Sequence, residues 1–434
     1  MKKPVALVLG SGSREHSVVE SVARSANVFW YPGNGITGVV GLRPLIKPGH
    51  TPLVTNPMEM LGLAGYVNAD LTFVGPEAPL DAGIADQFAA AGSLLLGPTR
   101  AAARLETSKV FAKEFMRRHN ILTADFRVFE DADEALAYVR NRNCSLVVKA
   151  DGLADGKGVY VCDDAQQAQR AVLELMVEKV HGKAGERIVI EEKLNGEECS
   201  FFVLCDGTVA IEFGTAGDHK RAFDGDLGPN TGGMGAFAPH PAMADLGLRE
   251  RIMREIIYPT LEGMKAEGYP FRGFLYVGLM LTDEGPKVIE FNVRLGDPEA
   301  QVILPLLESD AFELFRAAAT GRLKNYQALW SDQVAVGITM VSGRYPEKEM
   351  IKHRITGPIT PGQAILDVNV YHGATVREGE DFFATGGRVL TVVGKVQSYR
   401  VARDRAYSVV SQIHFENMRY RNDIAARVFQ PPMP

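Results

Sequence analysis

Residues 146–161 constrain the fold more than any other part of the chain. Two short apolar runs, 146–148 and 159–161, flank a segment with three glycines in seven residues, and Lys149 and Lys157 bracket that segment. Glycines let a backbone turn tightly and bring its N–H groups close to an anion. The pattern predicts two strands joined by a loop that can hold phosphate.

This loop does not match a Walker A motif. The interval from Gly152 to Lys157 is one residue too short, and Gly158 stands where that motif has the Ser or Thr that binds Mg²⁺. The residues after the loop also predict a strand, whereas a Walker A loop leads into a helix. A glycine-rich hairpin with solvated lysines remains the alternative interpretation.

Length and composition are those of an ordinary soluble globular protein. The 434 residues leave room for about two to four domains. The net charge of −6 argues against a general nucleic-acid binder. The four cysteines form no CxxC pair, which favours a reducing, cytoplasmic location. Since no apolar run reaches ~18 residues, we expect neither a membrane span nor a secretion signal.

The first hundred residues alternate short apolar runs with helix-like stretches. This alternation predicts a doubly wound parallel sheet, and ligands of such sheets bind beyond the carboxyl ends of the strands. Three loops are expected at that edge: 10–16, 32–37 and 75–80. The 10–16 loop lacks the third glycine of a dinucleotide fingerprint, and no acid follows the second strand, so an NAD-dependent oxidoreductase is disfavoured.

The rest of the chain predicts further α/β units. A helical segment begins near residue 100, a small α+β unit carries the glycine loop at about 125–195, and the last hundred residues are rich in β-structure. We therefore expect an α/β multidomain protein. The later strands are expected at 200–204, 209–213, 287–293, 334–341, 365–371 and 388–394, with a helix at 402–412.

A second strong pattern lies at 288–299. Because side chains alternate across a strand, Glu290, Asn292 and Arg294 should share one face. A carboxylate and an amide oxygen suit a hard cation such as Mg²⁺ that is shared with substrate phosphates, and the arginine suits a carboxylate or phosphate nearby. The alternative is an amphipathic strand with a solvated outer face.

Two further segments are weaker by themselves. Residues 218–221 are largely polar and basic, and residues 228–235 form a glycine-rich turn with a hydroxyl group, which together could bind an anion. A long surface loop explains this composition equally well. Residues 188–200 read as a strand, a turn and a strand, where an adenine edge could bind, although an acidic exposed hairpin is the more ordinary interpretation.

Together these segments closely resemble the glycinamide ribonucleotide synthetase (phosphoribosylamine–glycine ligase) family of the ATP-grasp superfamily, along nearly the whole chain. The resemblance implies a doubly wound N-terminal domain at 1–103, an ATP-grasp domain at 104–328 with a lid at about 125–195, and a small β-rich C-terminal domain at 329–434. The segments that carry the resemblance are 10–16, 32–34, 74–80, 97–99, 149–159, 218–221, 228–235 and 290–299.

The family's reaction joins glycine to 5-phospho-β-D-ribosylamine in de novo purine synthesis. Glycine and ATP form a glycyl phosphate, and the amine then displaces phosphate to give glycinamide ribonucleotide. The resemblance implies a cytoplasmic enzyme that binds ATP with Mg²⁺ or Mn²⁺, takes only small-molecule substrates, and is a monomer or weak dimer.

The resemblance also implies residue roles. The ATP contacts would be Lys109, Lys149, Asp155, Gly156, Lys157, Gly158, Glu191, Glu192, Leu194 and Glu198. The metal ligands would be Glu290 and Asn292. The substrate contacts would be Gly12, Ser13, Arg14, Glu15, Asn34, Glu77, Asp218, Lys220, Pro229, Asn230, Thr231, Gly232, Gly233 and Arg294, of which Asp218, Lys220 and Arg294 would be catalytic.

Several substrate loops depart from the family pattern. Ser13 stands where Gly is usual, Asp155 replaces Ala beside the phosphates, and Ala216 and Gly217 replace Ser and Gln. The loop at 32–37 also differs. Another ATP-grasp carboxylate–amine ligase or carboxylase, or a non-catalytic nucleotide-binding relative, is therefore kept as an alternative.

Overall fold

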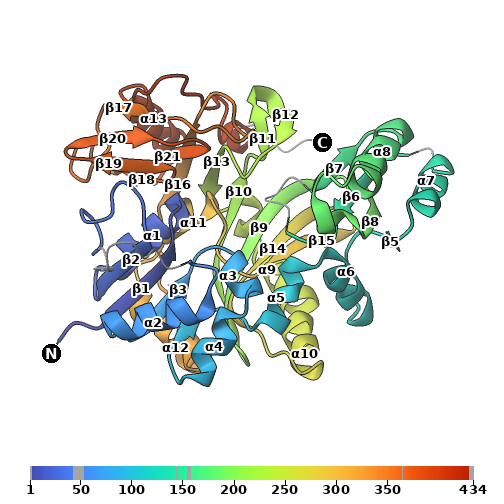
Figure 1. Ribbon diagram of the computed structural model, residues 1–434, viewed down its shortest axis with the longest axis horizontal. Helices are drawn as coiled ribbons and strands as arrows, with labels where there is room; N and C mark the ends of the chain where they lie inside the picture. Colours follow the sequence, from blue (N-terminus) through green and yellow to red (C-terminus); the bar gives the residue numbers. More distant parts are fainter. Residues whose placement is uncertain (1, 43–52, 143, 154–157, 364, 430–434) are drawn as a thin grey trace.

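The computed structural model describes residues 2–42, 53–142, 144–153, 158–363 and 365–429 (Figure 1). The N-terminal part is a four-stranded parallel sheet of order β2-β1-β3-β4, which confirms the predicted doubly wound sheet. Its strands are β1 (Val5–Gly10), β2 (Asn27–Pro32), β3 (Leu71–Val74) and β4 (Leu95–Leu96), and its helices are α1 (Ser13–Val22), α2 (Pro57–Val67), α3 (Ala78–Asp81) and α4 (Ile84–Ala90).

Two different apolar cores cover the two faces of this sheet. Along β1, Ala6 and Val8 belong to one core and Leu7 and Leu9 to the other, as the alternation of side chains across a strand requires. Helix α1 packs into the first core, and α2 and α4 pack into the second. The three predicted ligand loops therefore leave the sheet at its carboxyl edge, directly after β1, β2 and β3.

An eight-stranded antiparallel sheet forms the body of the molecule, in the order β15-β14-β9-β10-β13-β16-β21-β18. The three longest strands of the β-rich C-terminal part therefore do not form a separate sheet: β16, β21 and β18 extend the body sheet through β13 (Figure 1). The strands are β9 (Glu197–Asp206), β10 (Ala210–Asp218), β13 (Gly235–Ala238), β14 (Arg272–Thr282), β15 (Gly285–Asn292), β16 (Val334–Val341), β18 (Val368–His372) and β21 (Arg388–Val396).

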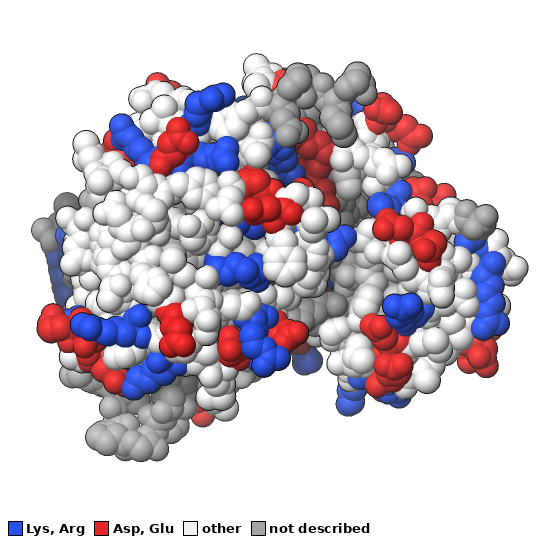
Figure 2. Space-filling view, turned by 90° about the horizontal axis from the view of Figure 1, so that it is seen from above, with Lys and Arg blue, Asp and Glu red and all other residues white. Residues whose placement is uncertain are grey.

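The lid is a third unit with its own apolar core. Its antiparallel sheet has the order β5-β8-β6-β7, and β6 and β7 form the predicted hairpin, in which Lys149 pairs with Val159. In the space-filling view the lobe on the right, which holds the lid, is set off from the rest of the molecule by a hollow (Figure 2). The elements are β5 (Phe126–Phe129), α7 (Ala132–Arg140), β6 (Leu146–Ala150), β7 (Val159–Cys162), α8 (Ala165–Val172), the π-helix η1 (Leu173–Val177) and β8 (Ile188–Glu192).

The remaining helices and short strands pack around these units. The last long helix starts three residues before the predicted 402, because Ser398 is its N-cap, and it buries Ala402, Ala406, Val409 and Val410. The part of the chain that the structure describes contains no helix long and apolar enough to cross a membrane. The helices are α5 (Arg100–Thr107), α6 (Lys109–Arg118), α9 (Leu246–Ile252), α10 (Tyr258–Ala266), α11 (Glu299–Ile303), α12 (Ala311–Ala319) and α13 (Tyr399–Val410), and the short strands are β11 (Arg221–Phe223), β12 (Leu227–Asn230), β17 (His353–Ile355), β19 (Thr375–Glu378) and β20 (Asp381–Ala384).

Helix α1 joins the N-terminal sheet to the C-terminal strands. Nine of its ten residues are buried. The ring of His16 accepts a hydrogen bond at Nδ1 from the main-chain N–H of His372, at 2.8 Å, and lies edge-on to Tyr371. This histidine is therefore part of a buried contact between the two ends of the chain.

Candidate active site

The end of strand β15 brings together the predicted cation ligands. The Asn292 amide lies 3.5 Å from Glu290 Oε1, and an Arg294 nitrogen lies 3.4 Å from Asn292 Oδ1, so the three side chains share one face as predicted. Lys109 Nζ lies 3.4 Å from Glu290 Oε2. Burial alone would raise the pKa of Glu290, but Lys109, Lys220 and Lys149 outweigh it and hold the pKa well below the ordinary range. Glu290 is therefore a carboxylate at neutral pH.

A divalent cation fits this donor set if the substrate supplies further oxygens. Within the described ranges, no group of three or more His, Cys, Asp or Glu side chains could hold a metal by itself. A carboxylate and an amide oxygen are hard ligands of the kind Mg²⁺ prefers when phosphate oxygens complete its shell. The Glu290–Asn292 pair has that chemistry.

Lys149 reaches the same place from the lid. Its Nζ donates to the carbonyl of Ile289, at 3.0 Å, and forms a buried ion pair with Glu191. Lys109 and Lys149, which are predicted to bind ATP phosphates, therefore converge from two distant segments on the end of β15. Gly158, the last residue of the predicted phosphate loop, accepts a hydrogen bond from Ala150 N at 2.8 Å. The other loop residues named for ATP, Asp155, Gly156 and Lys157, lie outside the described residues.

The predicted adenine and ribose contacts lie where the lid returns to the body. Glu191 and Glu192 end β8, Leu194 follows it, and Glu198 is the second residue of β9. The Glu191 carboxylate is buried between Lys149 and Lys113, so its side chain is not available to a nucleotide base. Glu198 Oε2 lies 3.1 Å from Lys220 Nζ. This arrangement joins the predicted ribose contact to the predicted catalytic lysine.

Asp218 and Lys220 form a charged group beside Glu198. Burial raises the pKa of Asp218, Glu299 and Glu198 raise it further, and Lys220 opposes the rise. Burial lowers the pKa of Lys220, but Glu198 and Asp218 more than reverse this, so the pKa is raised and Lys220 stays an ammonium. A permanent positive charge next to a carboxyl group with a raised pKa suits a site that binds phosphate and handles an amine.

Arg294 lies between two carboxylates, one of which the sequence did not reveal. Its Nε is 3.2 Å from Glu77 and its Nη2 is 2.8 Å from Glu106. Glu106 is buried and also accepts a hydrogen bond from Val293 N at 2.7 Å. Burial raises the pKa of Glu106; at Glu77 burial acts in the same direction, but Arg294 and Arg14 reverse it and lower the pKa to about 2. The pattern that could have revealed Glu106 is an acid on the buried face of an alanine-rich helix.

The N-terminal loop is held by its own hydrogen bonds. The Glu15 carboxylate accepts from Gly12 N at 2.5 Å and from Arg14 Nε at 2.7 Å. Arg14 also donates to the carbonyl of Leu295, and Ser13 Oγ donates to that of Tyr371 at 3.4 Å. The structure thus places this predicted substrate loop next to the segment that follows Asn292.

The two ends of the 229–233 turn have different surroundings. Arg388, from the C-terminal strands, donates to the carbonyls of Gly232 and Asp297, both at 2.5 Å, and thereby holds the turn near the Arg294 segment. Thr231 Oγ1 donates to the carbonyl of Lys220, and a side chain at Gly233 would collide with Pro298. Pro229 and Asn230 instead line a cavity of about 1100 Å³ between the lid and the C-terminal part, and none of the predicted ATP or metal residues that the structure describes lines it.

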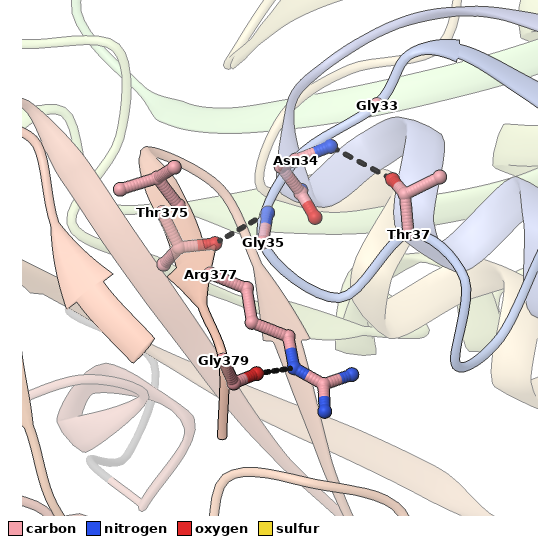
Figure 3. Close-up of a pocket in the computed structure, with 8 residues that line it drawn as sticks. Gly33, Asn34, Gly35, Thr37, Thr375, Arg377 and Gly379 are labelled. Carbon is pink, nitrogen blue, oxygen red and sulfur yellow. Dashed lines mark hydrogen bonds between the residues drawn. The ribbon is translucent and has the colours of Figure 1, made fainter. Parts of the chain in front are cut away.

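Asn34 joins the N-terminal sheet to the C-terminal part. Its amide donates to the carbonyls of Ser11 and His372, at 3.0 and 2.7 Å. It lies in a cavity of about 460 Å³ between the 33–37 loop and the β19 hairpin, with Arg377 on the opposite wall (Figure 3). Of the predicted ATP and metal residues that the structure describes, none lines this cavity either.

Comparison with known proteins identifies relatives over the whole length. Residues 5–106, 107–300 and 335–427 match the N domain, the ATP-grasp (A) domain and the C domain of phosphoribosylglycinamide synthetase. Phosphoribosylamine–glycine ligase of Ralstonia nicotianae is 44% identical over 98% of this chain and 99% of its own, and that of Escherichia coli O6:H1 is 43% identical over 98% of both.

Solved structures agree with this comparison. The crystal structure of phosphoribosylamine–glycine ligase from Thermotoga maritima superimposes with a TM-score of 0.81 at 31% identity, and covers 97% of this chain and 100% of its own. Biotin carboxylase from Campylobacter jejuni, in a beta-gamma-ATP complex, has a TM-score of 0.71 at 13% identity over 98% and 99% of the two chains. That likeness shows a shared fold alone.

Proposed function

The chain belongs to the phosphoribosylglycinamide synthetase family, and we propose that its site ligates glycine to 5-phospho-β-D-ribosylamine with ATP to give glycinamide ribonucleotide, ADP and phosphate. The observation that carries the proposal is the convergence of Lys109, Lys149 and the Glu290–Asn292 pair at one end of β15. Two lysines from distant segments beside a carboxylate and an amide suit the triphosphate of one nucleotide.

The reaction needs no protein nucleophile. The glycine carboxylate attacks the γ-phosphorus of ATP and ADP leaves; the amine then attacks the carbonyl carbon of the glycyl phosphate and phosphate leaves. The protein's contribution is to position the reactants and to neutralise charge on the moving phosphoryl group. A bound divalent cation, Mg²⁺ or Mn²⁺ held by Glu290 and Asn292, would supply part of that neutralisation.

The described residues divide this work between two sides of the site. On the ATP side, Lys109 and Lys149 bind phosphates, the main chain at Glu191, Glu192 and Leu194 binds adenine, and Glu198 binds ribose. The lid, which carries Lys149, closes over the phosphates. Exclusion of water by this closure protects the acyl phosphate from hydrolysis.

On the acceptor side, Arg294 binds the glycine carboxylate or the acyl phosphate. Glu77 and Glu106 fix its guanidinium in place, which leaves less freedom to lose when substrate binds. Lys220 and Asp218 face the phosphoribosylamine, together with the loops at 12–15 and 231–233. Asn34, Pro229 and Asn230 complete the proposed substrate contacts, and Asn34 also donates hydrogen bonds to the carbonyls of Ser11 and His372.

The same proposal includes the division of the chain. The N-terminal domain comprises 1–103, the ATP-grasp domain 104–328 with its lid at about 125–195, and the C-terminal domain 329–434. The enzyme is cytoplasmic, a monomer or weak dimer, takes small-molecule partners and binds no nucleic acid. The mixture of Lys, Arg, Asp and Glu on the face shown in Figure 2 agrees with the last point.

An ADP-release assay tests the function. Phosphoribosylamine is generated in place, and glycine, the amine and the divalent cation are omitted one at a time. ADP formation that needs glycine and phosphoribosylamine together supports the proposal. Replacement of glycine by bicarbonate or another acid without loss of rate would identify a different ligase or carboxylase.

A further inference from the structure

We propose that Lys113, which belongs to none of the motifs above, is a positioning residue for the ATP phosphates. It holds the Glu191 carboxylate, which in turn holds Lys149. The inference rests on the proposed function only in taking ATP as the ligand.

Lys113 is attached to the body strand that carries the cation ligands. It lies on α6 with 3% of its side chain exposed. Its Nζ pairs with Glu191 Oε2 and donates to Thr123 Oγ1 at 2.7 Å, and Thr123 Oγ1 donates to the carbonyl of Val288 at 2.6 Å. Because so little of Lys113 is exposed, it acts on a ligand through Glu191.

Lys149 completes the chain of contacts from the other side. Its Nζ pairs with Glu191 Oε1 and donates to the carbonyl of Ile289. The Glu191 carboxylate thus bridges α6 of the body and β6 of the lid. Lys113, through Thr123, and Lys149 are hydrogen-bonded to the carbonyls of two consecutive residues of β15, which directly precede Glu290. The position of Lys149 beside the cation ligands therefore depends on Lys113.

The charges of Lys113, Glu191 and Lys149 explain why the carboxylate needs a second lysine beside it. Glu191 alone would cancel the charge of Lys149, whereas Lys113 leaves the three groups with one net positive charge to offer a phosphate. Burial lowers the pKa of Lys113 to about 8; Glu191 opposes the fall, and Lys149 and Lys109 add to it. Lys113 is therefore mostly charged at pH 7 and loses its charge at mildly alkaline pH.

A purely structural role for Lys113, as an attachment of the lid, is the alternative. Arg117 provides the matched control, because it also reaches from α6 to the lid without contacting Glu191. It donates to the carbonyl of Phe126 at 3.3 Å, and its guanidinium lies 4.0 Å from the centre of the Phe126 ring.

The test compares ATP with adenosine, which has no phosphate, by isothermal titration calorimetry on the full chain. Lys113→Met should weaken ATP binding by about tenfold and change adenosine binding much less, since one charge-assisted contact is lost. Lys113→Arg should keep most of the ATP affinity. Arg117→Met should leave the ratio of the two affinities as in the wild type.

Equal weakening of ATP and adenosine, unchanged ATP affinity in Lys113→Met, or the same selective loss in Arg117→Met would each overturn the proposal. If Lys113→Met does not fold, the test is the pH dependence of ATP affinity, measured for the wild type and for Lys113→Arg. The wild type's ATP affinity should fall as pH rises through about 8 while its adenosine affinity stays level, and Lys113→Arg should lack the fall. A level ATP affinity in the wild type from about pH 7 to 9 would refute the assignment.

This readout is independent of the ligase reaction. Nucleotide binding is measured without glycine or phosphoribosylamine. A protein that binds ATP with the expected dependence on Lys113 but releases no ADP with those substrates would contradict the proposed function and leave this inference standing.

Discussion

The lid and the C-terminal strands are attached to the body in opposite ways. The C-terminal strands continue the body sheet from β13 through β16 and share its main apolar core. The lid has a separate sheet and a separate core, and its contacts with the body include polar ones such as Lys149 to Ile289 and Glu191 to Lys113. A shared core fixes two parts together, whereas a few charged contacts can be broken and re-formed when a ligand arrives.

The largest expected effect is on turnover. Glu290→Gln should lower ligation by about a thousandfold or more, because the carboxylate that would hold the cation is lost. Thermal unfolding should stay cooperative, since Glu290 lies at the junction of lid and body and not in a core. The matched control is Glu284→Gln, because that carboxylate is exposed and pairs with the nearby Lys287. Near-normal turnover of Glu290→Gln would show that the junction of lid and body takes no part in the reaction.

A pair of core substitutions tests whether the lid is a separate unit. Phe237 lies in the shared core and Leu175 in the lid core, and both are fully buried. Phe237→Ala should cost about 3–5 kcal/mol of global stability. Leu175→Ala should instead accelerate amide hydrogen exchange in β5 to β8 and leave the melting of the body close to wild type. Equal shifts of one melting transition by both variants would show that lid and body unfold as one.

Acid should loosen the contact between the N-terminal sheet and the body at Arg294. The pKa of Glu77 is about 2 in the folded chain against an ordinary 4.5, so its carboxylate stabilises the fold above pH 4.5 and this contribution disappears as pH falls toward 2. Glu77→Gln should lose about 3 kcal/mol at pH 7, and the deficit should shrink below pH 4.5. Urea unfolding at several pH values measures this loss in the free energy of unfolding. A deficit that does not change with pH would contradict the stabilising role of the Glu77 carboxylate.

The smallest effect concerns a single backbone angle in the lid. Lys179, after η1, is exposed and has a φ of 51°, a conformation that glycine adopts without steric penalty. Lys179→Gly should stabilise the lid by about 1 kcal/mol and slow its amide exchange without moving the melting of the body. The neighbouring Glu178 has an ordinary helical φ of −77°, so Glu178→Gly should act in the opposite direction.

The features that could be predicted from the sequence were local ones. Strand alternation was enough to place Glu290, Asn292 and Arg294 on one face, and glycines between apolar runs were enough to predict the β6–β7 hairpin. These local patterns could not predict contacts between segments that lie far apart in the chain. Lys113 and Arg388 belong to no motif that points to their partners, and Arg388 bonds to a carbonyl 156 residues away.

The attachment of the C-terminal strands was missed for the same reason. Alternation in residues 334–341 predicts a strand but does not say which strand it will pair with, because the hydrogen-bonding groups of every backbone are alike. The partner is β13, whose four residues, Gly235–Ala238, were too short a run to be recognised. The small side chains of Gly235 and Ala236 carry little of the β-propensity that marks a strand.

The burial of α1 has a consequence for biosynthesis. The partners that cover this helix, Leu295 and His372, follow it by 281 and 356 residues along the chain. A ribosome must therefore translate most of the message before the first helix can be fully shielded from water, because β1 and β2 cover only part of it. Until then the nascent chain displays an apolar surface, and we expect chaperones to associate with it during translation.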